Sequence, residues 1–109
     1  MKIDVLGTQY TIEFRERNTD KLLNNGVDGY CDHSGKLIVI NTTQDGDLLN
    51  FKAYKKQVLR HEIIHAFLNE SGLSADWEHK PQGYEETVVD WIAIQFPKLL
   101  NAFKEAQAI

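Results

Sequence analysis

The sequence contains one cysteine, two prolines and one methionine among its 109 residues. Cys31 cannot form a disulfide within the chain, and the sequence has no CxxC pair that could build a thiolate zinc site. A nucleophilic thiol assisted by His33, two residues further on, is one interpretation. Free cysteines are more often simply buried, so we expect Cys31 to be a small strand residue.

Long apolar runs and an excess of positive charge are also lacking. No apolar run approaches the length of a membrane span, and the first ten residues alternate in polarity instead of forming the apolar block of a signal peptide. Twelve Lys and Arg residues face sixteen Asp and Glu residues, which gives a net charge of −4. We therefore expect a cytoplasmic protein without a membrane or nucleic-acid partner.

The length and composition suit a small globular protein. A hydrophobic content of 42% with 26% charged residues is ordinary for such a chain. A chain of this length can form one domain with one modest core, so we predict a single domain over residues 1–109.

The amino-terminal part of the chain shows the period-two alternation of strands. Residues 2–6 and 10–14 predict a hairpin with a turn at Gly7 and Thr8, and residues 27–33 and 37–40 predict a third and a fourth strand. Four consecutive apolar residues at 37–40 indicate a strand that is covered on both faces or lies beside an active cleft. A short helix is predicted at residues 20–23.

The second half of the chain predicts helices. Apolar residues at helical spacing between residues 51 and 68 predict a helix that is apolar over most of its circumference, and therefore buried, and that ends at Ser71 and Gly72. A second helix is predicted at residues 84–96, and a short terminal helix at residues 98–108 after Pro97. Strands followed by helices indicate an α+β fold.

The first of these helices carries the sequence His61-Glu62-Ile63-Ile64-His65, which is an HExxH motif. Residues four apart lie on the same face of a helix, so two imidazoles can bind one metal ion. HExxH on a helix is typical of zinc peptidases, in which the two histidines bind Zn²⁺ and the glutamate is the general base. The motif therefore predicts zinc ligands at His61 and His65 and a catalytic role for Glu62.

A catalytic zinc usually has three protein ligands, so the motif is one ligand short. Glu85, Glu86 and His79 are the candidates. We favour Glu86 because Asp90 follows it at i+4, where its carboxylate can orient a ligand histidine, and ligand histidines usually have such a partner. Glu85 has no acidic residue at i+4.

His79 leaves several interpretations open. It can be the third ligand of a three-histidine site, a hydrogen-bond donor to the oxyanion formed during catalysis, or a solvent-exposed loop residue. Tyr84 is another candidate donor, although a tyrosine near the start of a helix is more often simply packed.

HExxH followed about twenty residues later by ExxxD resembles the gluzincin group of zinc metallopeptidases, of which thermolysin is a member. The strands before the motif and the residues from His61 to Leu68 look like the compact ImmA/IrrE-like metallopeptidases of bacteria, phages and mobile elements. The resemblance covers roughly residues 37–96 and is strongest over the HExxH helix. SprT-like proteases also have HExxH but use a third histidine, which keeps His79 open as a ligand.

The resemblance implies a zincin-like α+β fold, in which a small sheet of about four strands packs on an active-site helix and on a second, ligand-bearing helix. It implies Zn²⁺ at His61, His65 and Glu86, with Glu62 as the base, and a substrate peptide along an edge strand, here residues 37–40. In some relatives the target is a DNA-bound repressor. We therefore predict a zinc metalloendopeptidase that acts on a protein substrate such as a repressor; the alternative is a non-catalytic regulatory binding module with a structural zinc.

Overall fold

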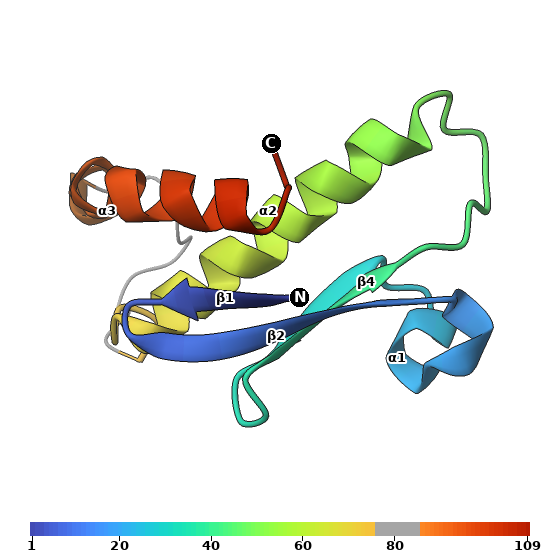
Figure 1. Ribbon diagram of the computed structural model, residues 1–109, viewed down its shortest axis with the longest axis horizontal. Helices are drawn as coiled ribbons and strands as arrows, with labels where there is room; N and C mark the ends of the chain where they lie inside the picture. The colour runs from blue at the N-terminus through green and yellow to red at the C-terminus, as the bar shows by residue number, and fades with distance from the viewer. Residues whose placement is uncertain (76–85) are drawn as a thin grey trace.

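The structure is a computed structural model that describes residues 1–75 and 86–109 and shows a compact α+β fold (Figure 1). Four strands form one mixed sheet: β1 (Lys2–Val5), β2 (Thr8–Arg15), β3 (Gly29–Asp32) and β4 (Leu37–Asn41). Their order is β1-β2-β4-β3, with β2 and β4 parallel and the two other pairs antiparallel. The α+β class and the four strands agree with the prediction.

The hairpin of β1 and β2 closes through two residues with positive φ, Leu6 at 52° and Gly7 at 92°. Two consecutive residues in this region form a tight turn whose twist matches that of antiparallel strands. The predicted hairpin is therefore confirmed, with its turn one residue earlier than expected.

Strand β4 lies inside the sheet, between β2 and β3. The expectation that residues 37–40 form an edge strand for substrate is therefore wrong, because both backbone edges of β4 are already hydrogen-bonded. Its run of apolar residues reflects cover on both faces, since Ile38 and Ile40 belong to the main core while Val39 is buried outside it. The edges of the described sheet are β1 and β3.

A short helical region connects β2 to β3. It consists of the 3-10 helix η1 (Arg17–Thr19) and helix α1 (Lys21–Asn24). The side chain of Asp20 caps α1 by accepting hydrogen bonds from the backbone N–H groups of Leu22 and Leu23. The short helix predicted at this position is confirmed.

Helix α2 (Phe51–Glu70) carries the HExxH motif, as predicted. Only one side of it is buried, at Leu59, Glu62, Ile63, Ala66 and Phe67, so the prediction of a helix buried around its circumference is wrong. Ile64 and both histidines are exposed because they lie outside this buried stripe of the helix. A surface helix with one apolar stripe is the ordinary arrangement in globular proteins.

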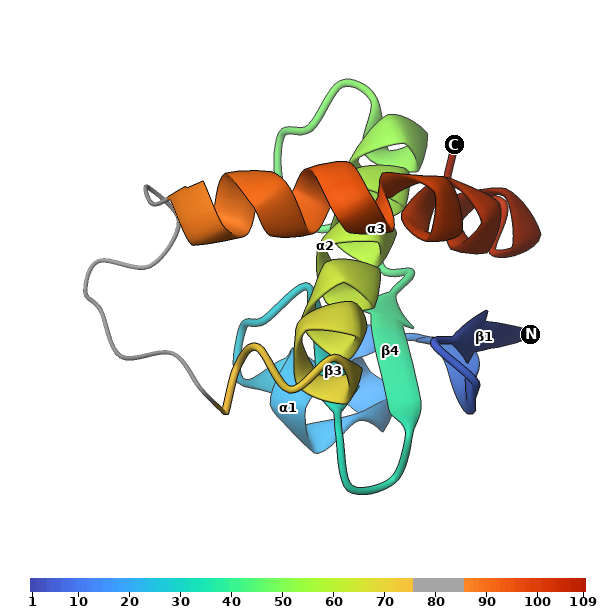
Figure 2. The same ribbon diagram turned by 90° about the vertical axis from the view of Figure 1, so that its left-hand side faces the viewer.

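Helix α3 (Glu86–Glu105) runs through Pro97 without a break, so the two predicted helices are one. Figures 1 and 2 both show the two halves of α3 pointing in different directions. Proline removes one backbone hydrogen bond and clashes with the preceding turn, so a bend at this position is expected. In the described part of the chain, no helix combines the length and apolarity needed to cross a bilayer.

The main core lies between the sheet and the two long helices. It takes buried residues from β1, β2, β4, α2 and the second half of α3. The opposite face of the sheet is polar around Tyr30 and Arg15, whose side chains both contact Asp20. The two faces thus separate an apolar layer under α2 from a hydrogen-bonded layer beside α1.

Candidate functional site

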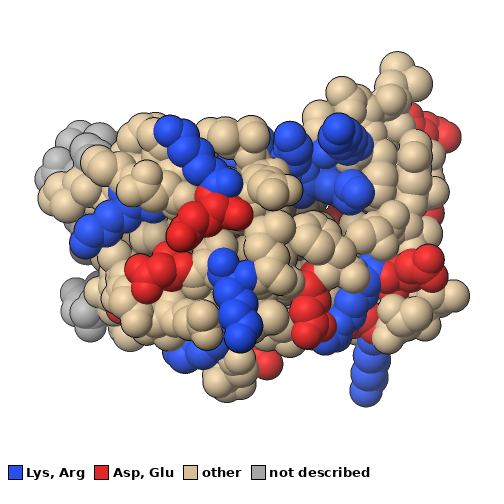
Figure 3. All heavy atoms as spheres, in the orientation of Figure 1, with Lys and Arg blue, Asp and Glu red and all other residues tan. Residues whose placement is uncertain are grey.

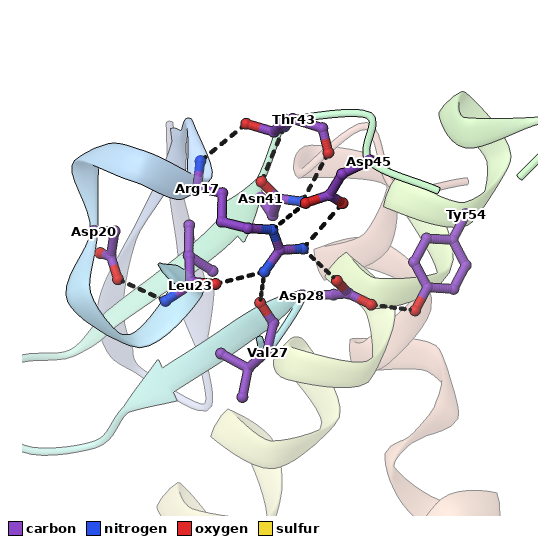
Figure 4. A network of polar contacts seen from close by, with 9 residues as sticks. All are labelled: Arg17, Asp20, Leu23, Val27, Asp28, Asn41, Thr43, Asp45 and Tyr54. Atoms are coloured by element: carbon purple, nitrogen blue, oxygen red, sulfur yellow. Dashed lines mark hydrogen bonds and ion pairs between the residues drawn. The ribbon is translucent and has the colours of Figure 1, made fainter. Parts of the chain in front are cut away.

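Helix α2 is held against the sheet at both of its ends. Near its start, the Tyr54 hydroxyl donates a 2.6 Å hydrogen bond to Asp28, just before β3. Arg17 donates to the other Asp28 oxygen at 2.8 Å and also binds Asp45 and the Val27 carbonyl (Figure 4). This network links the start of α2, the start of β3 and the loop after β4.

At the end of α2, Glu70 accepts three hydrogen bonds from the sheet. The donors are the Tyr10 hydroxyl at 2.8 Å, the Thr8 hydroxyl at 3.2 Å and the Lys36 ammonium group at 2.6 Å. These bonds lower the pKa of the Glu70 carboxyl. The HExxH motif lies between the two anchored ends, so its side chains project from a helix with little freedom to shift.

The two motif histidines point toward each other. The Nε2 atoms of His61 and His65 are 3.1 Å apart. Two nitrogens bound to one tetrahedral zinc at about 2.0–2.1 Å lie about 3.3 Å apart, so this spacing fits two ligands of one ion. Partial burial and the charges of His61 and His33 lower the pKa of His65, which favours the neutral imidazole that binds metals.

Glu62 differs from the two histidines because it is only 7% exposed. Its carboxylate and the ring nitrogens of His61 and His65 all lie within 4.8 Å of one another. Burial raises the pKa of Glu62, and the nearby His61 opposes this effect. No described residue donates a hydrogen bond to its carboxylate, which leaves the oxygens available to another molecule.

Strand β3 forms the other wall of the site because alternate residues of a strand face the same way. A Cβ atom on Gly29 would lie 2.8 Å from Val58 Cγ1, so the absence of a side chain allows β3 to approach α2 closely. Cys31 is influenced by the charge of Glu62. The facing side of β3 therefore runs along α2 toward the motif.

Cys31 and His33 border the same cavity as the motif, although the HExxH spacing did not predict either of them as part of the site. This cavity of about 390 Å³ is lined by Gly29, Tyr30, Cys31, His33, His61, Glu62 and His65. The period-two spacing of positions 29, 31 and 33 was the signal that could have placed these residues together. Burial, then the charge of Glu62, raises the pKa of Cys31 to about 12, so its thiol is protonated and is not an activated nucleophile.

A second hollow of about 300 Å³ continues from this cavity toward the start of α2. It shares Gly29, His61 and Glu62 with the first and is further lined by Asp28, Tyr54, Gln57 and Val58. Together the two hollows form a groove between α2 and the edge strand β3. A groove bordered by an unpaired strand edge can hold an extended peptide through backbone hydrogen bonds.

The remaining predicted site residues are only partly located. Glu86 and Asp90 both lie in the first part of α3, on one helix and four residues apart as predicted, but their side chains lie outside what the structure describes. His79, Glu85 and Tyr84 lie outside the described residues altogether. The Trp91 indole donates a 3.1 Å hydrogen bond to the Ser71 hydroxyl, which ties the first half of α3 to the end of α2.

Comparisons with known proteins identify no relative of this chain. No family model, no curated protein and no solved structure matches it. The geometry of the groove and of the three motif side chains is therefore the basis for assigning a function.

Proposed function

We propose that this protein is a zinc-dependent metalloendopeptidase with a zincin-like fold, in which His61, His65 and Glu86 bind Zn²⁺ and Glu62 is the general base. The observation that carries the proposal is the 3.1 Å separation of the two imidazole nitrogens beside a buried carboxylate to which no described residue donates a hydrogen bond. The two imidazoles at the wall of one groove supply two of the donors that zinc requires, and the Glu62 carboxylate beside them is placed to act on a bound water. The ImmA/IrrE-like resemblance of the sequence supports the same assignment.

Glu62 performs the proton transfers in this proposal. When bound, zinc lowers the pKa of a coordinated water to about 7 and polarises a carbonyl group. Glu62 accepts the proton of the attacking water and later delivers it to the leaving amine. Burial raises the pKa of this carboxyl, and a base whose pKa is closer to the working pH both accepts and returns a proton more readily.

The substrate peptide lies along β3 in this proposal, and not along β4. Strand β3 is an edge of the described sheet and borders the motif, so its outer backbone groups can pair with an extended chain. A substrate side chain that enters the neighbouring hollow meets Tyr54, Gln57 and Val58. A protein substrate such as a repressor satisfies these requirements if it presents an extended segment.

The experiment measures zinc content and peptide hydrolysis of the purified protein and of its Glu62→Gln variant. We expect one zinc per chain in both proteins, and hydrolysis only in the unmodified one. His61→Ala is the matched control, because it should lose the zinc as well as the activity. Loss of zinc from Glu62→Gln would show that Glu62 is a ligand and would contradict its role as the base.

A regulatory binding module with a structural zinc is the second candidate. The observation in its favour is that Cys31 and His33 line the same cavity as the motif histidines, since structural zinc sites are closed by four Cys or His ligands. Cobalt substitution separates the two functions, because a thiolate ligand adds an intense sulfur-to-metal absorption band. That band, together with an absence of hydrolysis, would replace the peptidase by the binding module.

A further inference from the structure

The core between α2 and the sheet opens at one end. Along β2, alternate residues face the core, and Tyr10 and Ile12 are almost completely buried. Phe14 continues the same face but remains 46% exposed. The Phe14 ring therefore faces the core side of the sheet but is only partly buried at this end of β2.

Along α2, too, the buried apolar side gives way to more exposed residues toward this end of the core. Leu59 and Ile63 on its inner side are buried, but the preceding positions of this side are Lys52, Lys55 and Lys56. Positions 52, 55, 56 and 59 follow helical spacing and share one face. Lysines therefore stand where an ordinary amphipathic helix would continue its apolar stripe.

These residues form a hollow of about 220 Å³, which we call the lysine groove. It is lined by Met1, Phe14, Lys52, Lys55, Lys56, Leu59, Ala106 and Gln107. Its floor is apolar and its rim is positively charged. At about 100° per residue, this side of α2 is almost opposite to the side that carries His61 and His65, so the groove is separate from the candidate metal site.

The three lysines have no anionic partner among the described residues. The Lys55 ammonium group lies 5.4 Å from the centre of the Phe51 ring, which is a contact that does not neutralise its charge. Figure 3 shows Lys and Arg side chains gathered over the amino-terminal half of α2. Since the chain as a whole carries a net charge of −4, this cluster opposes the general charge of the protein.

We propose that the lysine groove binds an acidic segment of a partner protein that presents one apolar side chain between its carboxylates. The apolar side chain packs on Phe14, Met1 and Leu59, while the carboxylates pair with the lysines on the rim. A nucleic acid would use the charge but would leave the apolar floor unused. The charge pattern and the floor together therefore favour a peptide.

The experiment measures the anisotropy of a labelled synthetic peptide of Asp and Glu residues with one central Phe. We expect saturable binding that weakens as salt is added. A peptide with Ser in place of the Phe should bind about tenfold more weakly, since one buried aromatic side chain exceeds the 1.4 kcal/mol that a factor of ten represents. The Lys52→Glu/Lys56→Glu variant should also lose at least about tenfold.

The control variant is Lys21→Glu/Lys98→Glu, which makes the same change in net charge at two exposed lysines outside the groove. It should bind the Phe peptide with almost unchanged affinity. If Lys52→Glu/Lys56→Glu fails to fold, Lys52→Ala/Lys56→Ala replaces it, with a smaller expected loss.

Four results would overturn the proposal. These are an absence of peptide binding, equal losses in the test and control variants, tighter binding of a DNA duplex than of the Phe peptide, and self-association that disappears in Lys52→Glu/Lys56→Glu. The third result would assign the groove to nucleic acid, and the last to a second copy of this chain.

Discussion

Asp20 and Glu62 are two carboxylates of nearly equal burial, 8% and 7% exposed, in very different surroundings. Asp20 accepts hydrogen bonds from the backbone of Leu22 and Leu23 and from the side chains of Arg15 and Tyr30. Burial alone would raise its pKa, but these bonds outweigh burial and lower the pKa to about 2. Glu62 has no such bonds with described residues, and burial raises its pKa.

The difference separates a carboxylate that supports the fold from one that is available for chemistry. A buried charge is costly unless it is paired, so the surroundings of Asp20 remove that cost while those of Glu62 leave it in place. A cost of this kind is expected at a functional site, where groups are selected for reactivity and not for stability.

The largest effect concerns zinc affinity. If Glu86 is the third ligand as proposed, Glu86→Ala should remove most of the affinity, and Asp90→Asn should reduce affinity or activity by about 10–100-fold, as for partners that orient ligands. His79→Ala should leave the zinc content intact. Metal analysis of the three variants beside Glu62→Gln decides the ligand set. An empty site in His79→Ala with zinc retained in Glu86→Ala would establish a three-histidine site.

Asp20→Ala should destabilise the protein by about 2–4 kcal/mol. The loss of a helix cap costs about 1 kcal/mol, and leaving the partly buried partners of Asp20 unpaired costs about 1–3 kcal/mol more. Urea denaturation measures the change. The control is Asp47→Ala, an exposed residue without a hydrogen bond to described residues, which should change stability by less than about 0.5 kcal/mol.

The pH dependence of stability should also report on Asp20. Because its pKa falls from 3.8 to about 2 on folding, its contribution is complete above the ordinary value and is lost as the pH falls toward 2. The loss amounts to about 2 kcal/mol. Urea denaturation between pH 2 and pH 6 should show a steeper decline for the unmodified protein than for Asp20→Asn. Parallel curves would mean that Asp20 is not strongly paired.

Glu62→Gln should stabilise the metal-free protein at pH 7, by about 1 kcal/mol. Because the pKa of Glu62 is raised on folding, the folded protein loses stability as the pH rises above 4.5, the ordinary pKa of a glutamate. A glutamine at this position does not ionise, so the variant does not lose stability in this way. In the presence of chelator the melting temperature should rise by about 4–8 °C at pH 7, with a much smaller change near pH 4. A lower melting temperature at pH 7 would show that Glu62 has a structural partner.

Local features of the fold could be predicted from the sequence, because local chemistry determines them. Alternation located β1 and β2, a continuous apolar run located β4, the segment between Val27 and His33 was recognised as β3, and the HExxH helix was placed correctly. The position of β4 inside the sheet could not be predicted, since it depends on the parallel pairing of β2 with β4 across the segment that contains α1 and β3. The exposure of Ile64 likewise depends on which elements pack against α2.

The candidate site was predictable in part for the same reason. His61, Glu62 and His65 come together through helical spacing alone. His33 and Cys31 join the cavity only because β3 lies beside α2, and Gly29 allows that approach. The bend in α3 could not be predicted from the sequence. The pattern around Pro97 favoured a break between two helices, whereas the proline lies within one continuous helix.

All the described residues of the cavity beside the HExxH motif come from one continuous stretch of chain, from β3 through β4 into α2. A hairpin followed by a helix makes mostly local contacts, and local contacts form early in folding. We therefore expect the cavity walls to assemble before β1 and the second half of α3 complete the core. Pulsed hydrogen exchange during refolding should then show protection of β3, β4 and α2 ahead of β1, so that the candidate active site belongs to the folding nucleus of this small protein.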